Sequence, residues 1–151
     1  MSVLANKRRL SQMQFYKNAF DLSTKMTLEL LVKLKKNKVN LEEFIINNFI
    51  NKIMNTLDDI MEYITKANAI YPTIEAEVEK RRLLQDDAIC SCEHLYVILE
   101  RLVAIYPAEL KNVMQYIDDI DHLIKLLRRW KQSNNKIMKS IEEKKNKNSG
   151  I

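Results

Sequence analysis

The sequence predicts an all-α protein folded as an antiparallel up-down-up-down four-helix bundle. Its 151 residues include one glycine and two prolines, too few for the turns that a β-sheet normally needs. Apolar residues make up 46% of the chain and recur at helical spacing in four long segments. Because short connections force neighbouring helices to run in opposite directions, we expect one bundle over residues 10–140. A basic arm at 1–9 should precede it, and a polar, disordered tail at 141–151 should follow.

The first two helices are expected over roughly 10–36 and from about Asn40 to Tyr71. Asn40 and Glu43 have the spacing of a capping box, with Asn in place of the usual Ser or Thr. The apolar stripe predicted for the first helix comprises Met13, Tyr16, Phe20, Met26, Leu30, Leu31 and Leu34. The second helix carries a heptad seam with alternating gaps of four and three, formed by Ile46, Ile50, Ile53, Leu57, Ile60, Ile64, Ala67 and Tyr71.

Pro72 is expected to end the second helix and Thr73 to cap the third, which should run to about Ile105. Pro107 suits the first turn of a fourth helix. The third seam comprises Arg81, Gln85, Ala88, Cys92, Leu95, Leu99 and Leu102, and the fourth Leu110, Val113, Ile117, Ile120, Leu123, Leu127, Trp130, Ile137 and Ile141. Polar residues on an apolar seam need partners. Arg81 and Gln85 therefore either bond to neighbouring helices or face a ligand or a second subunit.

The net charge of +5 is unevenly distributed along the chain. Residues 1–40 hold nine basic and two acidic side chains, residues 41–122 seven and sixteen, and residues 123–151 nine and two. In the expected topology, the starts of the first and third helices meet the ends of the second and fourth. This basic pole gathers Lys7, Arg8, Arg9, Lys66, Lys80, Arg81, Arg82, Arg128, Arg129 and Lys131, with Asn68, Tyr71, Gln85 and Trp130 among them.

Two interpretations of the basic pole remain open. Lys and Arg attract phosphates, and aromatic rings stack on unpaired bases, which favours a nucleic-acid surface. Basic residues also complement the dipoles at helix ends, and a Trp at heptad spacing commonly packs in a core. Trp130 is therefore either a core residue or part of the contact surface.

The residues signal no catalytic chemistry, and we expect a protein that is not an enzyme and has no cofactor. Gly150 is the only glycine, which excludes a glycine-rich phosphate loop. Asp119 and His122 lack the second copy that a di-metal bundle requires, so no metal is expected. Cys90 and Cys92 are expected to be reduced thiols. Because no apolar run approaches 18 residues, the chain is predicted to be cytoplasmic and not to insert into a membrane.

Three stretches resemble linked signatures of the Avd-like four-helix-bundle family: ANAIYPT at 67–73, EKRRLLQDDAICSCEHL at 79–95 and LIKLLRRWKQSNNK at 123–136. These proteins are accessory variability determinants of diversity-generating retroelements, related to the ribosomal-RNA intervening-sequence family. The resemblance covers roughly 10–140 and implies a bacterial or phage-encoded homopentamer that binds a reverse transcriptase and contacts RNA or DNA. The residues that match the signatures are Arg81, Arg82, Gln85, Arg128, Trp130, Lys131 and Ser133.

The function expected from these features is that of a non-enzymatic accessory factor that binds the reverse transcriptase and nucleic acid through the basic pole. The candidate site residues are Arg8, Arg9, Lys80, Arg81, Arg82, Gln85, Arg128, Arg129, Trp130 and Lys131. The acidic middle of the chain supports an alternative. In that case the protein is a protein-only adaptor or scaffold of a phage or mobile element and does not bind nucleic acid directly.

Overall fold

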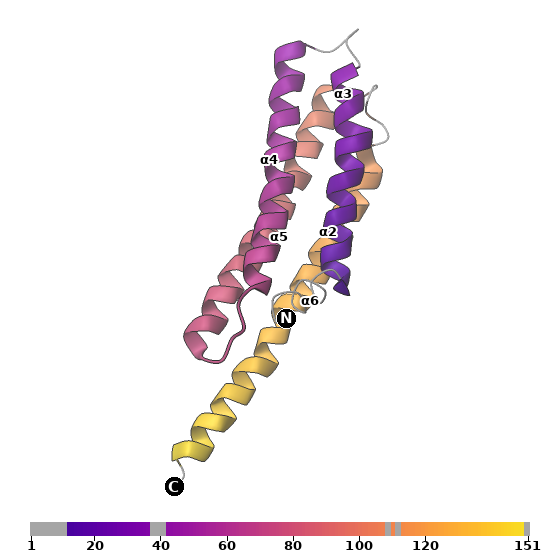
Figure 1. Ribbon diagram of the computed structural model, residues 1–151. Helices are drawn as coiled ribbons and strands as arrows, with labels where there is room; N and C mark the ends of the chain where they lie inside the picture. Colours follow the sequence, from indigo (N-terminus) through magenta and orange to yellow (C-terminus); the bar gives the residue numbers. More distant parts are fainter. Residues whose placement is uncertain (1–11, 37–41, 108–109, 111–112, 150–151) are drawn as a thin grey trace.

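The computed structural model describes residues 12–36, 42–107, 110 and 113–149, and every regular element within them is helical. The first helix consists of α2 (Gln14–Lys25), the π-helix η1 (Met26–Leu31) and α3 (Val32–Lys36). It is followed by α4 (Glu43–Asn68), α5 (Glu75–Ile105) and α6 (Met114–Ser149). The predicted all-α class is confirmed. In Figure 1 the chain rises through α2 and α3, descends along α4, rises along α5 and descends along α6, which is compatible with the expected up-down order.

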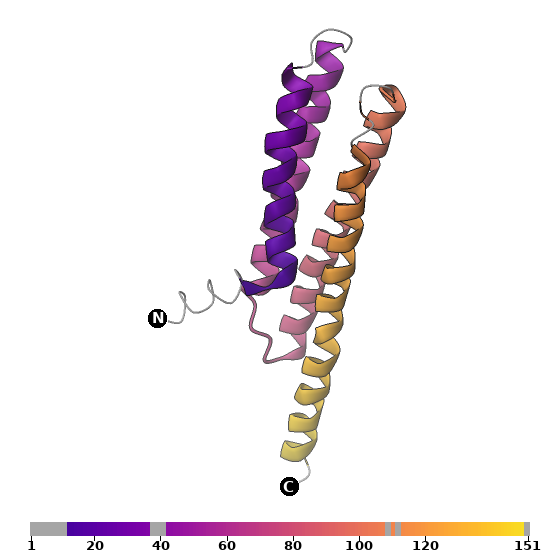
Figure 2. The same cartoon turned by 90° about the vertical axis from the view of Figure 1, so that its right-hand side faces the viewer.

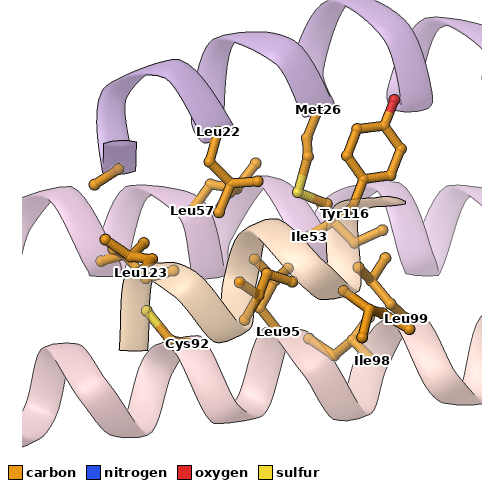
Figure 3. Close-up of a cluster of buried hydrophobic side chains, with 14 of the residues drawn as sticks. Leu22, Met26, Ile53, Leu57, Cys92, Leu95, Ile98, Leu99, Tyr116 and Leu123 are labelled. Carbon is orange, nitrogen blue, oxygen red and sulfur yellow. The ribbon is translucent and has the colours of Figure 1, made fainter. Parts of the chain in front are cut away.

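The helices enclose one hydrophobic core. The most extensive contacts join α4 to α5 and α5 to α6, and the first helix packs between α4 and α6. Figure 3 shows side chains from all four helices converging, including Met26, Ile53, Leu99 and Leu123. Each of these four is fully buried. The apolar periodicity of the sequence therefore produces a continuous interior rather than separate helical hairpins.

The first helix differs from its prediction because it contains η1, a π-helical segment. Its buried residues are Phe15, Ala19, Leu22, Met26, Leu30, Leu31 and Leu34. From Met26 the stripe continues through two gaps of four, to Leu30 and then to Leu34. In a regular α-helix, each gap of four turns the stripe by about 40°. The wider π-helical turn offsets this rotation after Met26. Phe20, which was predicted on the stripe, is 52% exposed because Phe15 and Ala19 face the core instead.

The seam predicted for α4 is confirmed except at two positions. Phe49 is buried where Ile50 was expected, and Ile50 is only partly covered. Tyr71 lies beyond the end of the helix and is exposed. The residues buried as predicted are Ile46, Ile53, Leu57, Ile60, Ile64 and Ala67. The capping box expected from Asn40 falls outside the described residues, and Glu42 occupies the N-cap without a side-chain hydrogen bond.

The start of α5 is fixed by Glu77 rather than by capping from Thr73. One carboxylate oxygen of Glu77 accepts hydrogen bonds from the Thr73 hydroxyl at 2.8 Å, the Thr73 N–H at 3.0 Å and the Ile74 N–H at 3.3 Å. The bonds from Thr73 lower the pKa of Glu77. This is the half of a capping box in which an acidic side chain reaches back to free backbone donors.

The last helix both begins and ends later than predicted, because α6 starts at Met114 and not at the turn of Pro107, and continues to Ser149. The tail expected to be disordered is therefore helical over 141–149. No proline or glycine lies between Pro107 and Gly150. Glu143 is four residues from both Lys139 and Lys147, a spacing that supports helix formation in water. In Figures 1 and 2 this end of α6 projects beyond the other helices.

The predicted basic arm at 1–9 lies outside the described residues. Within the described part of the chain, no helix combines the length and the hydrophobicity needed to cross a membrane.

Candidate nucleic-acid interface

Trp130 lies at the point where the start of α2 meets α5 and α6. Its ring stacks on Phe15, with centroids 4.0 Å apart and planes 16° from parallel. The guanidinium carbon of Arg81 lies 5.6 Å from the centroid of the same indole. Trp130 is only 8% exposed. Of the two interpretations, core packing is therefore correct, and the ring does not form an open platform for bases.

Gln85 forms a side-chain hydrogen bond with the neighbouring helix α6, which is one of the two alternatives expected from the sequence. The Asn134 side-chain Nδ2 donates a hydrogen bond of 2.6 Å to Oε1 of Gln85. Both side chains are fully buried. Asn134 was missed by sequence reasoning, although it lies four residues after Trp130 and three before Ile137. The heptad spacing could have identified it, but only if a polar residue had been allowed on the seam.

Several polar atoms around this bond are buried without a hydrogen-bond partner. The donors are Nε of Arg81, Nε2 of Gln85 and Nε1 of Trp130, and the acceptor is Oδ1 of Asn134. Burial lowers the pKa of Arg81, because an apolar environment disfavours the charged guanidinium. Unpaired buried polar groups are uncommon in folded proteins. This end of the bundle therefore combines a positive charge with an excess of donors.

The basic residues between α5 and α6 are mostly engaged in ion pairs. Arg82 pairs with Glu79 at 3.1 Å and Arg128 with Glu93 at 3.2 Å. Lys131 pairs with Asp86 across the two helices. Such surface pairs are weak. A phosphate can therefore replace the carboxylates, but their presence reduces the local positive potential.

A shallow groove of about 790 Å³ runs between α5 and α6. Three predicted site residues line it, namely Arg82, Arg128 and Lys131. The same groove contains the carboxylates of Asp86 and Glu93. The structure thus brings these basic residues together on one surface, but it does so together with acidic residues.

The remaining predicted site residues divide into two groups. Lys80 and Arg129 are exposed. Neither is in an ion pair with any residue that the structure describes. Arg8 and Arg9 lie outside the described residues.

Helix α6 contributes exposed basic residues beyond the predicted site residues, and two of them, Lys125 and Lys136, lie on the same face as the predicted Arg129. Lys125, Arg129 and Lys136 follow one another at intervals of four and seven, which places them on one face of the helix. Other exposed lysines continue toward its end, at Lys139, Lys144, Lys145 and Lys147. The basic surface is therefore more extended along α6 than the predicted pole.

The two cysteines differ in environment. Cys92 is fully buried, and burial raises the pKa of its thiol to about 12. Cys90 is exposed. In the part of the chain that the structure covers, no three side chains of His, Cys, Asp or Glu cluster in a way that could hold a metal ion.

No protein-family model matches this sequence, and neither a curated protein nor a solved structure does so.

Proposed function

We propose that this protein is a non-enzymatic accessory factor of a diversity-generating retroelement, which binds nucleic acid and a reverse transcriptase through its basic pole. The single observation that supports nucleic-acid binding is the concentration of exposed Lys and Arg on α6, next to the basic residues of α5. The resemblance to Avd-like proteins supports the reverse transcriptase as partner. We further propose a cytoplasmic homopentamer of antiparallel up-down-up-down bundles.

Binding in this proposal depends mainly on charge. Phosphates contact the exposed basic face of α6, including Lys125, Arg129 and Lys136, and release bound counterions. In the groove, Arg128 and Lys131 exchange their carboxylate partners for phosphate oxygens. Because the carboxylates compete, affinity should be moderate and strongly dependent on salt. Bases do not stack on Trp130, since its ring is covered by Phe15.

The assignment of the surface is tested with two variants that remove equal charge. The first changes Arg82, Arg128 and Arg129 to Ala, and the matched control changes Lys33, Lys35 and Lys36 of α3 to Ala. In Figure 1, α3 lies at the opposite end of the bundle from the C-terminal part of α6. We expect the first variant to weaken binding of single-stranded RNA by at least about tenfold and to reduce the salt slope, by up to roughly 0.7 for each lost phosphate contact.

The control variant should bind within about threefold of the unmodified protein, since charges far from the contact are screened. Fluorescence anisotropy with labelled RNA measures both, and circular dichroism checks that both remain helical. Equal losses in the two variants would mean that overall charge, and not this surface, determines binding.

The proposed homopentamer is tested separately by multi-angle light scattering. A pentamer should have about five times the 17.9 kDa mass of one chain. A homogeneous species of 17.9 kDa at micromolar concentration would rule it out.

The alternative function is that of a protein-only adaptor, and it is favoured by exposed carboxylates on α4 and α5 such as Asp58, Asp59 and Glu100. An adaptor of this kind should co-purify with the reverse transcriptase but show no salt-dependent affinity for RNA or DNA. Changing the three residues to their amides should then weaken capture of the reverse transcriptase. In the accessory-factor proposal the same change leaves RNA binding intact.

A further inference from the structure

Arg81 differs from the other basic residues of the pole in the way its charge is compensated. Arg82 and Lys131 are also half-buried, but each pairs with a carboxylate. Lys80 and Arg129 are exposed to solvent. Arg81 is half-buried and has no carboxylate within ion-pair distance among the residues that the structure describes. A half-buried guanidinium without a counter-ion is unusual, because buried charges are normally paired.

The Arg81 guanidinium makes a cation–π contact with Trp130. Its central carbon lies 5.6 Å from the centroid of Trp130, which in turn stacks on Phe15 at 4.0 Å. Nε of Arg81 is buried without an acceptor. The two terminal nitrogens are not among the buried atoms that lack a partner, and they donate to no residue that the structure describes. The planar end of the side chain thus lies against the indole, and among the described residues its outer nitrogens have no acceptor.

The surroundings of Arg81 favour an acceptor-rich ligand. Gln85 lies one turn further along α5, and its Nε2 is a buried donor without a partner, as is Nε1 of Trp130. Asn134 supplies the one unpaired acceptor of this cluster. The cluster therefore offers Arg81 more unpaired donors than acceptors and no negative charge, whereas an oxyanion offers a guanidinium both acceptor oxygens and a negative charge.

We propose that Arg81, held against Trp130, is an oxyanion-binding residue, and that its ligand is a phosphodiester group of the bound nucleic acid. The identity of the ligand rests on the function proposed above, whereas the oxyanion site itself rests on the geometry of Arg81. Trp130 acts as a positioning residue, because the guanidinium lies over its ring, and it does not need to touch the phosphate. The contact then depends on the planar fork of Arg and not only on its charge.

The site is tested by nuclear magnetic resonance on the full chain labelled with nitrogen-15. Trp130 is the single tryptophan, so its indole N–H gives one unambiguous signal. Inorganic phosphate should shift this signal and that of Arg81 Nε–H in a saturable manner, whereas sodium chloride at the same ionic strength should not. Absence of a saturable shift beyond that caused by chloride would overturn the proposal.

Two arginines of α5 that lie over aromatic rings provide a matched comparison. Arg81→Lys retains the charge but loses the fork, and should raise the dissociation constant for phosphate at least about tenfold. Arg101→Lys, at a residue outside the basic pole whose guanidinium carbon lies 5.7 Å from the centroid of Phe49, should change it by less than about twofold. Arg81→Met, which preserves the apolar stem over Trp130, should abolish the shift while the protein stays folded. Equal affinity in the Arg81→Lys variant and the unmodified protein would also overturn the proposal.

A second titration, with single-stranded RNA, separates the two proposals. Salt-dependent RNA binding that is unchanged in the Arg81→Lys variant would refute the role of Arg81 but leave the proposed function standing. Saturable phosphate binding that needs Arg81, with no RNA binding at low salt, would keep the oxyanion site. It would refute both the phosphodiester as its ligand and the proposed function.

Discussion

Leu99→Ala is expected to lower the free energy of unfolding by about 2–5 kcal/mol. Leu99 is fully buried on α5, among apolar residues of the other helices (Figure 3). Truncation removes transfer free energy and leaves a cavity that the packed helices cannot close completely. Loss of this size is a large fraction of the roughly 5–15 kcal/mol that stabilises a typical domain.

The matched control is Leu83→Ala on the same helix. Leu83 is 62% exposed, so its truncation should change stability by no more than about 0.5 kcal/mol. Urea unfolding followed by circular dichroism measures both variants, and the slope of free energy against urea should stay constant. Similar losses of stability in the Leu83→Ala and Leu99→Ala variants would show that Leu99 is not packed in the core as described.

Gln85→Met and Asn134→Leu are each expected to destabilise the protein by about 1–3 kcal/mol, because each leaves the other residue's amide buried without its hydrogen bond. The two residues are joined by the buried 2.6 Å bond between α5 and α6. Met and Leu approximately preserve the shapes of Gln and Asn. Combining both changes removes the stranded polar groups and should cost much less than the sum of the two single changes.

A double-mutant cycle by urea unfolding gives this coupling directly. Asn135→Leu, at the exposed neighbour of Asn134, serves as the control and should change stability by no more than about 0.5 kcal/mol. Additive effects of Gln85→Met and Asn134→Leu would mean that the two side chains do not interact in solution.

The sequence predicted the fold best where the helices are regular. On α4 the alternating gaps of four and three identify a single stripe, and most of its residues are buried. On the first helix, Phe15 and Tyr16 are both apolar neighbours, so spacing alone could not decide which one begins the stripe. The stripe that begins at Phe15 stays buried after Met26 with the help of the π-helical segment. To choose that stripe from the sequence, one would need to know which face of the helix the other helices cover.

The sequence predicted part of the arrangement around Trp130 but not the pairing of the basic residues. Arg81 and Gln85 stood out as polar residues on an apolar seam, and the structure places Arg81 over Trp130 and joins Gln85 to Asn134. The ion pairs of Arg128 and Lys131 could not be foreseen, since they depend on how α5 and α6 are rotated and aligned against each other. Spacing within one helix carries no information on that alignment.

The measurement that tests the central proposal most directly is an anisotropy titration of labelled single-stranded RNA and duplex DNA at about 50 and 200 mM salt, with Trp130 emission followed in parallel. If about four phosphates are contacted, affinity should fall roughly 10²-fold between the two concentrations. Emission should also change, since Arg81 lies against the indole. Absence of binding to either nucleic acid at the lower salt concentration would contradict the proposed function and favour the protein-only adaptor.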